Sequence, residues 1–317
     1  MAGFLDRSSE CRGPARAFIL AALMVLLAAG AGCASVNVQY PSSVGIGKPL
    51  VIRATSSVPL TGVEAIWQGR TTQLAITVWN EHYVALGLMG TQVGKVKPGD
   101  HRLKLRLVDG DRTSEHSLTI KITPVQYKED RLTLPEKMVS PPQSELKRIE
   151  AERKLVGAAL ATMTGDRLWA LPILRPVQGI VTSPYGRRRI INGKAGSPHG
   201  GVDFRAASGT PVKAALPGRV VLTGDHYFAG KSVYVDSGGG VISMYFHLSS
   251  IDVAQGDMVK AGQVVAKSGS TGRSTGPHLH FGLSLSGQAV DSEPLFDSTS
   301  ANLLANSAFV KLTPAWR

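Results

Sequence analysis

Several features that would assign this chain to a class at once are scarce or missing. Its 317 residues include only two cysteines, which excludes a scaffold held together by many disulfides. No long run of Lys and Arg occurs, and basic residues are not interleaved with aromatic ones, so a nucleic-acid groove is not expected. The most apolar run, from Ala17 to about Ala31, is shorter than the roughly twenty residues of a membrane-spanning helix.

Positive charge is what the chain has in excess. The formal net charge is +12, and the sequence pI is about 9.8. A diffuse positive surface fits anionic lipid headgroups or an anionic wall polymer, although net charge also serves simple solubility. With 43% hydrophobic residues over this length, the chain is able to build two small cores.

The first 33 residues have the pattern of an export signal. Arg7, Arg12 and Arg16 precede the apolar run, and small residues follow it. A basic region, a short apolar region and small residues, in that order, are typical of a secretory signal peptide. An uncleaved membrane anchor is the alternative, which the short length of the run disfavours.

Both cysteines belong to this N-terminal region. Cys11 would be removed with the signal, whereas Cys33 stands where lipoprotein precursors are cut and acylated. The match is imperfect because Gly30 occupies a place usually taken by a large aliphatic residue, and ordinary cleavage near Ala31 or Ala34 is the alternative. We expect an exported protein of the cell envelope or periplasm, either free there or held at a membrane by a lipid on Cys33.

Residues 35–127 have the pattern of a small β-sandwich. Short segments with alternating apolar residues are separated by turns, and the last two flank Asp109-Gly110-Asp111, which indicates a hairpin. The strand-like segments are 50–54, 63–67, 74–79, 83–86, 102–108 and 116–122. Several short strands at this spacing predict a sandwich-like accessory domain. Its histidines form no ligand cluster and are expected at the surface or in packing.

Residues 128–170 are predicted to be a linker with one helix, from about 141 to 164. Ser140 is placed to cap it, a proline follows, and Gln143 completes a capping-box pattern. Apolar residues then recur at helical spacing as far as Met163. We expect this stripe to pack against one of the domains; a role in gating the catalytic groove is the alternative.

Residues 171–297 are rich in β signals and glycine, and they predict an antiparallel sheet whose groove holds the functional site. His226 lies between two of the strand-like segments and is expected at the rim of that groove. Residues 298–317 are assigned to a C-terminal tail. The whole chain is therefore expected to be mainly β, with two β domains joined by a helical linker.

Four histidines and one aspartate stand out in the C-terminal domain: His199, Asp203, His247, His278 and His280. Imidazole and carboxylate ligands suit a zinc ion that keeps one position open for water. Residues two apart on a strand share a face, so the last two histidines point the same way if their apolar run is a strand. Spacing alone leaves open which three bind the metal.

The spacing of His199 and Asp203 requires a bend. Four residues of straight strand span roughly 13 Å, which is too far for two bonds of about 2 Å to one ion. Gly200 and Gly201 lie between them, and glycine tolerates positive φ, so we expect the chain to curl there.

A set of motifs in fixed order carries a family resemblance from about Leu171 to Phe296. In chain order these are Thr182-Ser183-Pro184-Tyr185-Gly186-Arg187, His199 with Asp203, Gly209-Thr210-Pro211-Val212, Tyr245-Phe246-His247-Leu248, Gly256-Asp257-Met258-Val259, and the run from Gly269 to Phe281. This segment resembles the lysostaphin-type, LytM-like zinc endopeptidases, which cut peptidoglycan cross-bridges. One departure is Gly282, where an acidic residue often stands.

The resemblance implies roles for individual residues. It makes His199, Asp203 and His280 the ligands of Zn²⁺, and it makes His247 and His278 the catalytic histidines. Either of these two would accept a proton from water, and the other would steady the oxyanion. The order of β module, helix and peptidase also resembles the layout of Gram-negative envelope members of the family.

The expected function is therefore that of a zinc metallo-endopeptidase that hydrolyses peptide cross-links of peptidoglycan. Some relatives have the same fold but lose ligands and activate a separate cell-wall amidase, so a non-catalytic regulator with a protein partner is the alternative. A structural lipoprotein anchored to the wall would be a third case. Both alternatives predict gaps in the ligand set, and here every position is filled.

Overall fold

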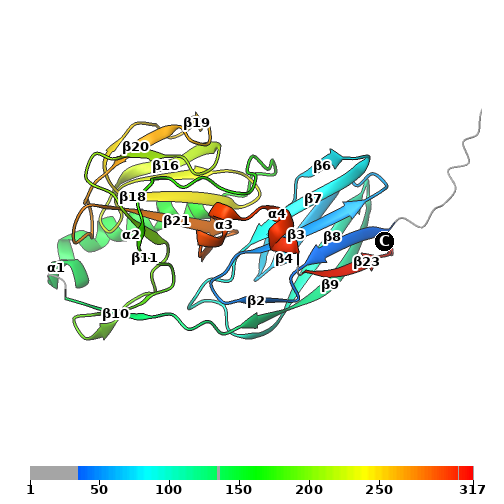
Figure 1. The fold of residues 1–317 in the computed structure, drawn as a ribbon, viewed down its shortest axis with the longest axis horizontal. Coiled ribbons are helices and arrows are strands. Elements are labelled where there is room, and N and C mark those ends of the chain that lie inside the picture. The colour runs from blue at the N-terminus through cyan, green and yellow to red at the C-terminus, as the bar shows by residue number, and fades with distance from the viewer. Residues whose placement is uncertain (1–34, 134–135, 306, 317) are drawn as a thin grey trace, which may run out of the picture. The chain divides into compact units, whose positions relative to one another are not determined.

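The computed structural model describes residues 35–133, 136–305 and 307–316 (Figure 1). Strands dominate it and helices are few and short, which confirms the prediction of a mainly β protein. Within the described ranges no helix has the length and apolarity needed to cross a membrane. Cys33 and the predicted export signal lie outside the described residues.

The N-terminal β domain consists of two five-stranded sheets. The first has the order β23-β1-β3-β7-β6, and the second has the order β2-β9-β8-β4-β5. Strands of the first sheet are β1 (Val36–Tyr40), β3 (Leu50–Ser56), β6 (Ile76–Trp79), β7 (His82–Met89) and β23 (Ala308–Leu312). Those of the second are β2 (Ser43–Gly45), β4 (Gly62–Trp67), β5 (Arg70–Gln73), β8 (Gly99–Asp109) and β9 (Arg112–Thr123).

The hairpin of β8 and β9 shows why these residues form a sandwich. Leu103, Leu105 and Leu107 are fully buried, while the residues between them face outward, as a strand with one covered face requires. Asp109 pairs with Arg112, so Gly110 and Asp111 form the turn. Gly110 has a φ of 58°, which a glycine adopts at little cost. The predicted hairpin is confirmed.

The C-terminal residues add a strand to this N-terminal domain. β23 pairs with β1 in an antiparallel register that runs from Val36 opposite Leu312 to Tyr40 opposite Ala308. Leu312 is 8% exposed and belongs to the sandwich core. The sequence pattern assigned this stretch to a tail, because five residues show no alternation strong enough to predict a strand without their partner.

The linker contains more structure than the one predicted helix. β10 (Glu129–Leu132) and α1 (Glu136–Val139) precede a short 3-10 turn (Gln143–Glu145) and α2 (Leu146–Leu160). α2 has no side-chain cap, and Ser140 instead donates to Glu136 at 2.7 Å. The helix ends at Leu160 and not near 164. The residues after it are held against a sheet turn instead, because the Thr164 hydroxyl donates to Asp236 and the Thr164 carbonyl accepts from the N–H of Gly239.

α2 packs on the C-terminal domain, as the stripe predicted. Val156, Ala159 and Leu160 form a small cluster with apolar residues of three sheet strands, including Leu222, Tyr234 and Met244. The stripe therefore covers part of the C-terminal sheet.

That sheet has ten strands and carries the functional site. Seven of its strands follow the order β11-β14-β21-β18-β17-β16-β19, with β15, β20 and β22 attached beside them. The strands are β11 (Val181–Ser183), β14 (Val202–Arg205), β15 (Pro211–Lys213), β16 (Gly218–His226), β17 (Gly230–Asp236), β18 (Val241–Ile251), β19 (Met258–Val259), β20 (Val264–Ser268), β21 (His278–Leu285) and β22 (Gln288–Val290). Helices α3 (Glu293–Asp297) and α4 (Ser300–Leu304) follow.

A small fourth sheet, of three strands, ties the linker to the C-terminal domain. β10 pairs in parallel with β12 (Arg188–Ile191), and β12 pairs with β13 (Lys194–Ala195). Arg187 reinforces the attachment through an ion pair with Asp130 at 2.7 Å. The linker is thereby held beside the segment that leads into His199.

Strand β23 generates a stability prediction. Leu312→Ala removes a side chain buried in the sandwich and should lower the free energy of unfolding by about 2 kcal/mol. Lys311→Ala, one residue earlier and exposed, is the matched control and should change it by less than about 0.5 kcal/mol. Urea titrations followed by tryptophan fluorescence measure both. Equal effects of the two substitutions would contradict the assignment of β23 to the sandwich core.

Candidate active site

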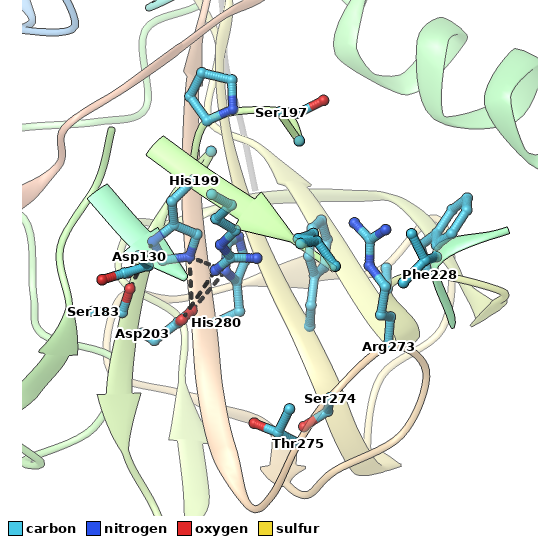
Figure 2. Close-up of a pocket in the computed structure, with 18 of the residues that line it drawn as sticks. Asp130, Ser183, Ser197, His199, Asp203, Phe228, Arg273, Ser274, Thr275 and His280 are labelled. Carbon is cyan, nitrogen blue, oxygen red and sulfur yellow. Dashed lines mark hydrogen bonds and ion pairs between the residues drawn. The ribbon is translucent and has the colours of Figure 1, made fainter. Parts of the chain in front are cut away.

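A groove of about 820 Å³ opens on the C-terminal domain, and all five residues singled out from the sequence line it (Figure 2). Its walls come from distant parts of the chain. The linker contributes Asp130, Val139 and Ser140, the segment around β12 and β13 contributes Arg189 and Lys194, and the loop before β21 contributes residues 273–275. The groove is therefore assembled only when these segments fold together.

Strand register brings two of the expected ligands together. β14 and β21 are antiparallel neighbours in which Asp203 lies opposite His280 and Arg205 lies opposite His278. Directly opposed residues have Cβ atoms roughly 4.5–5.5 Å apart. His278 and His280 both line the groove, as the two-residue spacing on a strand predicted.

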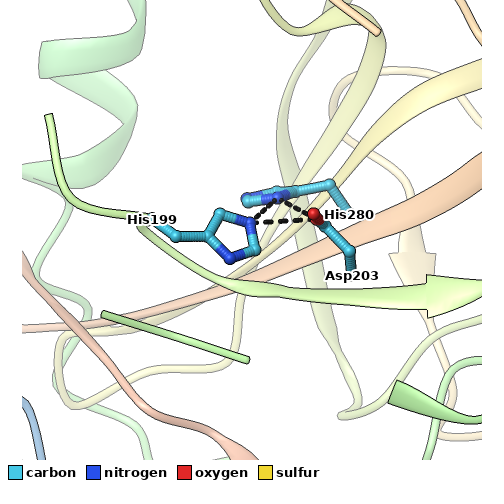
Figure 3. Close-up of side chains that lie close together, drawn as sticks. All are labelled: His199, Asp203 and His280. Atoms are coloured by element: carbon cyan, nitrogen blue, oxygen red, sulfur yellow. Dashed lines mark hydrogen bonds and ion pairs between the residues drawn. The ribbon is translucent and has the colours of Figure 1, made fainter. Parts of the chain in front are cut away.

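His199 completes a compact triplet with these two side chains (Figure 3). Its Nε2 lies 3.0 Å from Asp203 Oδ1 and 3.0 Å from His280 Nδ1, and His280 Nδ1 lies 2.8 Å from Asp203 Oδ1. Two nitrogens and one oxygen thus converge on one point.

The hydrogen bonds around His199 decide which of its nitrogens faces that point. Nδ1 lies 2.9 Å from the Pro184 carbonyl oxygen, which only accepts, so Nδ1 must carry the proton. The lone pair of neutral His199 is therefore on Nε2 and is directed at Asp203 and His280. A carbonyl that fixes the tautomer in this way is the usual support of a histidine that binds metal.

The triplet fits a zinc ion. Three electron-pair donors at about 3 Å repel one another unless a proton or a cation lies between them. Tetrahedral zinc with bonds of about 2.0–2.1 Å places its ligand atoms about 3.3 Å apart, so a widening of a few tenths of an ångström would admit it. A donor set of two imidazoles and one carboxylate is also one that zinc accepts in catalytic sites.

The chain does bend between His199 and Asp203, whose side chains meet at 3.0 Å, as expected. Positive φ is not the means, because neither Gly200 nor Gly201 has one. A Cβ at Gly201 would instead lie 2.4 Å from the Phe281 carbonyl oxygen and 2.7 Å from His280 Nε2. Glycine is required there because the backbone passes directly against the imidazole of His280.

His247 and His278 lie beside the triplet on its groove side. Their ring centroids are 4.8 Å apart, and His278 Nε2 is 3.8 Å from Asp203 Oδ1. Nδ1 of His247 is 2.8 Å from the Thr271 carbonyl, and Nδ1 of His278 is 2.8 Å from the Gly276 carbonyl. In its neutral form each of these histidines therefore carries the proton on Nδ1 and presents an unprotonated Nε2.

Backbone geometry aims His247 into the groove. It has a φ of 60°, an unusual value for a residue with a side chain, and its N–H donates to the Ala229 carbonyl at 2.9 Å. The pairing of β17 with β18 shifts register nearby, between Lys231 and Val233. Such irregularities redirect a side chain next to functional sites.

Burial and neighbouring charges set the electrostatics of the site. Burial, together with the charge of His280, lowers the pKa of His247 to about 4, so this imidazole is neutral at pH 7. Burial also lowers the pKa of His280. For Asp203, burial acts to raise the pKa, but the neighbouring imidazoles of His199 and His280 outweigh it and hold the pKa below its ordinary value.

Two further side chains lie outside the groove wall. Tyr245 is fully buried, accepts from Ala215 N at 2.7 Å and lies in the core, so it is a packing residue. His226 was expected at the groove rim, and this was wrong: it is 7% exposed and lies 2.7 Å from Ser232 Oγ. His226 therefore has a hydrogen-bond partner on the neighbouring strand and does not need contact with solvent.

Sequence reasoning missed two arginines in the groove. Arg189 lies 3.6 Å from the second oxygen of Asp203, and Arg273 stacks over the ring of Phe228 at 4.6 Å. The three carbonyls that orient the histidines were also missed, because main-chain atoms leave no mark in the sequence. For Arg273 a signal was present, since a basic residue interrupts a loop otherwise made of glycine, serine and threonine just before His278.

Comparisons with known proteins agree with this geometry. Residues 197–292, which include all five site residues, match the model of Peptidase family M23. A crystal structure described as a putative peptidase M23 from Pseudomonas aeruginosa is 32% identical, covers 81% of this chain and 93% of that chain, and aligns with a TM-score of 0.58. The chain belongs to peptidase family M23.

Two curated relatives match less than a third of this chain. Peptidoglycan DD-endopeptidase ShyA of Vibrio cholerae is 44% identical over 95 residues, which are 30% of this chain and 22% of that protein. Lysostaphin of Staphylococcus simulans is 48% identical over 99 residues, which are 31% of this chain and 20% of that protein. The chain thus matches about a fifth of the length of these relatives.

The neighbouring glycines offer a matched test of the site. Gly201→Ala should push the backbone away from His280 and destabilise the fold by about 1–3 kcal/mol. Gly200→Ala has open space around its Cβ and should be close to neutral. Urea unfolding gives the energies, and imidazole NMR shifts report the position of His280. An undisturbed His280 in Gly201→Ala would contradict the close approach.

Proposed function

We propose that this protein is a zinc-dependent endopeptidase that hydrolyses peptide cross-links of peptidoglycan in the cell envelope. The observation that carries the proposal is the convergence of His199, Asp203 and His280 in a groove that also holds two histidines with free Nε2 atoms. Membership of family M23 supports hydrolysis of a peptide bond. The similarity to ShyA, a peptidoglycan DD-endopeptidase, supports peptidoglycan as the substrate.

In this proposal the triplet holds Zn²⁺ and the remaining residues handle the proton. When bound, zinc supplies Lewis acidity that polarises the scissile carbonyl and makes water a better nucleophile. Nε2 of His247 or His278 accepts the proton of the attacking water, since a backbone carbonyl on Nδ1 leaves Nε2 as the acceptor of the neutral ring. Once protonated, the same atom donates to the leaving amine or to the developing oxyanion.

The non-catalytic alternative is a regulator that activates a separate amidase. It predicts at least one missing ligand or catalytic histidine, because such a protein no longer needs the site. Here the five residues are present and lie in one groove. The orientation of three histidines by carbonyls further favours the enzyme, since a vestigial site has no need of fixed tautomers.

The envelope location is part of the proposal. A peptidoglycan hydrolase must reach the wall, and the pattern of the first 33 residues predicts export. Lipid attachment at Cys33 and a regulatory protein partner remain predictions from the sequence.

Sacculus digestion tests the function directly. The purified chain, incubated with sacculi and zinc, should release soluble fragments whose mass spectra identify the bond cut. Chelator should abolish the release, and added zinc should restore it. Release that persists in chelator, or no release with any divalent metal tried, would refute the proposal; failure to cut combined with stimulation of an added amidase would instead identify a regulator.

Histidine variants test the division of roles. His280→Ala should lose bound zinc, because it removes one of three ligands. His247→Ala should retain the metal but reduce turnover by about 100-fold or more. His82→Ala, an exposed histidine in the N-terminal domain, is the control and should keep both properties. Metal content by mass spectrometry and fragment release provide the measurements, and loss of zinc in His247→Ala would show that the roles are wrongly assigned.

A further inference from the structure

Arg273 is a groove residue to which the hydrolytic chemistry assigns no task. It lies in the loop that leads from β20 into β21, five residues before His278, and its side chain lines the groove. Figure 2 shows it across the groove from the triplet of His199, Asp203 and His280, next to Phe228. A residue in this position can contact a ligand that occupies the groove.

Two contacts restrain Arg273, one made by its guanidinium and one by its main chain. Its charged carbon lies 4.6 Å from the centre of the Phe228 ring, which is a cation–π distance. Its main-chain N–H also donates to the Phe228 carbonyl at 2.9 Å. The arginine is therefore pre-organised, and little rotational entropy would be lost when it binds a ligand.

Phe228 is itself held from behind by the linker helix. Glu152 of α2 accepts from Tyr227 N at 2.8 Å, and Arg148 donates to the Asp225 carbonyl at 2.8 Å. Glu152 and Arg148 also pair with each other at 2.7 Å. α2 thus supports the loop that leads into Phe228, whose ring Arg273 contacts.

The charge of Arg273 has no counterion among the described residues, since none of them forms an ion pair or side-chain hydrogen bond with its guanidinium. Burial lowers the pKa of Arg273, and repulsion from the positively charged Arg189 lowers it further. A half-buried cation beside another cation, in a groove open to solvent, is an attractive site for an anion.

We propose that Arg273 is a specificity-determining residue that binds a carboxylate of the peptide substrate. Its planar fork matches a carboxylate in a two-point contact, and the Phe228 ring sets the plane of that fork. The inference rests on the proposed function, because it concerns the substrate of the same groove. It makes the preferred substrate an acidic peptide, whose carboxylate comes from a side chain or from the C-terminus.

Binding to metal-free protein tests this without requiring turnover. The chain is treated with chelator, and calorimetric titration measures its affinity for one synthetic stem peptide in three forms: with all carboxylates free, with side-chain carboxylates amidated, and with the C-terminus amidated. The free acid should bind about tenfold tighter than one of the amidated forms, and that form identifies the source of the carboxylate.

Variants assign the preference to one residue. Arg273→Gln should abolish the difference between acid and amide, and Arg273→Lys, which retains charge but not the fork, should reduce it by about threefold or more. Arg219→Gln, an exposed arginine of the same domain outside the groove, is the matched control and should retain the full difference. Thermal unfolding of each variant confirms folding, and Arg273→Lys decides the matter if the glutamine variant is unfolded.

Three results would overturn the inference: equal affinity for the three peptides, no binding of any of them, or an acid preference that survives in the Arg273 variants. None of these bears on hydrolysis, which sacculus digestion measures separately. An enzyme that cuts sacculi but ignores peptide carboxylates would therefore retain the proposed function and lose this role for Arg273.

Discussion

The site depends on holding three electron-pair donors within about 3 Å of one another. Like-signed partial charges at that distance are unfavourable in a partly buried environment, so the fold has to maintain the arrangement by other means. The register of β14 against β21 fixes Asp203 opposite His280, and the Pro184 carbonyl fixes His199. Gly201 allows the backbone to pass against His280, which no larger residue would permit.

A second regularity is that three histidines are oriented by the same device. Nδ1 of His199, His247 and His278 each faces a backbone carbonyl, at 2.8 to 2.9 Å. In its neutral form each ring therefore presents an unprotonated Nε2. The proposed metal ligand His199 and the two proposed catalytic histidines thus share one supporting arrangement.

Segments outside the family-matched region also shape the groove. The match covers residues 197–292, yet Asp130, Val139 and Ser140 of the linker line the groove, and α2 supports the loop that carries Phe228. Linker and catalytic sheet are thus parts of one structure. A change in the linker is expected to alter the groove wall before it moves Asp203 and His280, because strand register fixes these two residues.

The sequence by itself determined the mainly β class and singled out five side chains that line one groove: His199, Asp203, His247, His278 and His280. Side-chain types are visible directly in a sequence, and alternation on long strands such as β8 and β9 follows from burial of one face. Tertiary structure alone decided the rest. β23 and β10 form only with partners far away in the sequence, and the closeness of Gly201 to His280 and of Arg273 to Phe228 depends on how strands pack. Contacts between distant segments produce no periodic pattern in the sequence. The carbonyls that orient the histidines are also invisible there, because every residue has one.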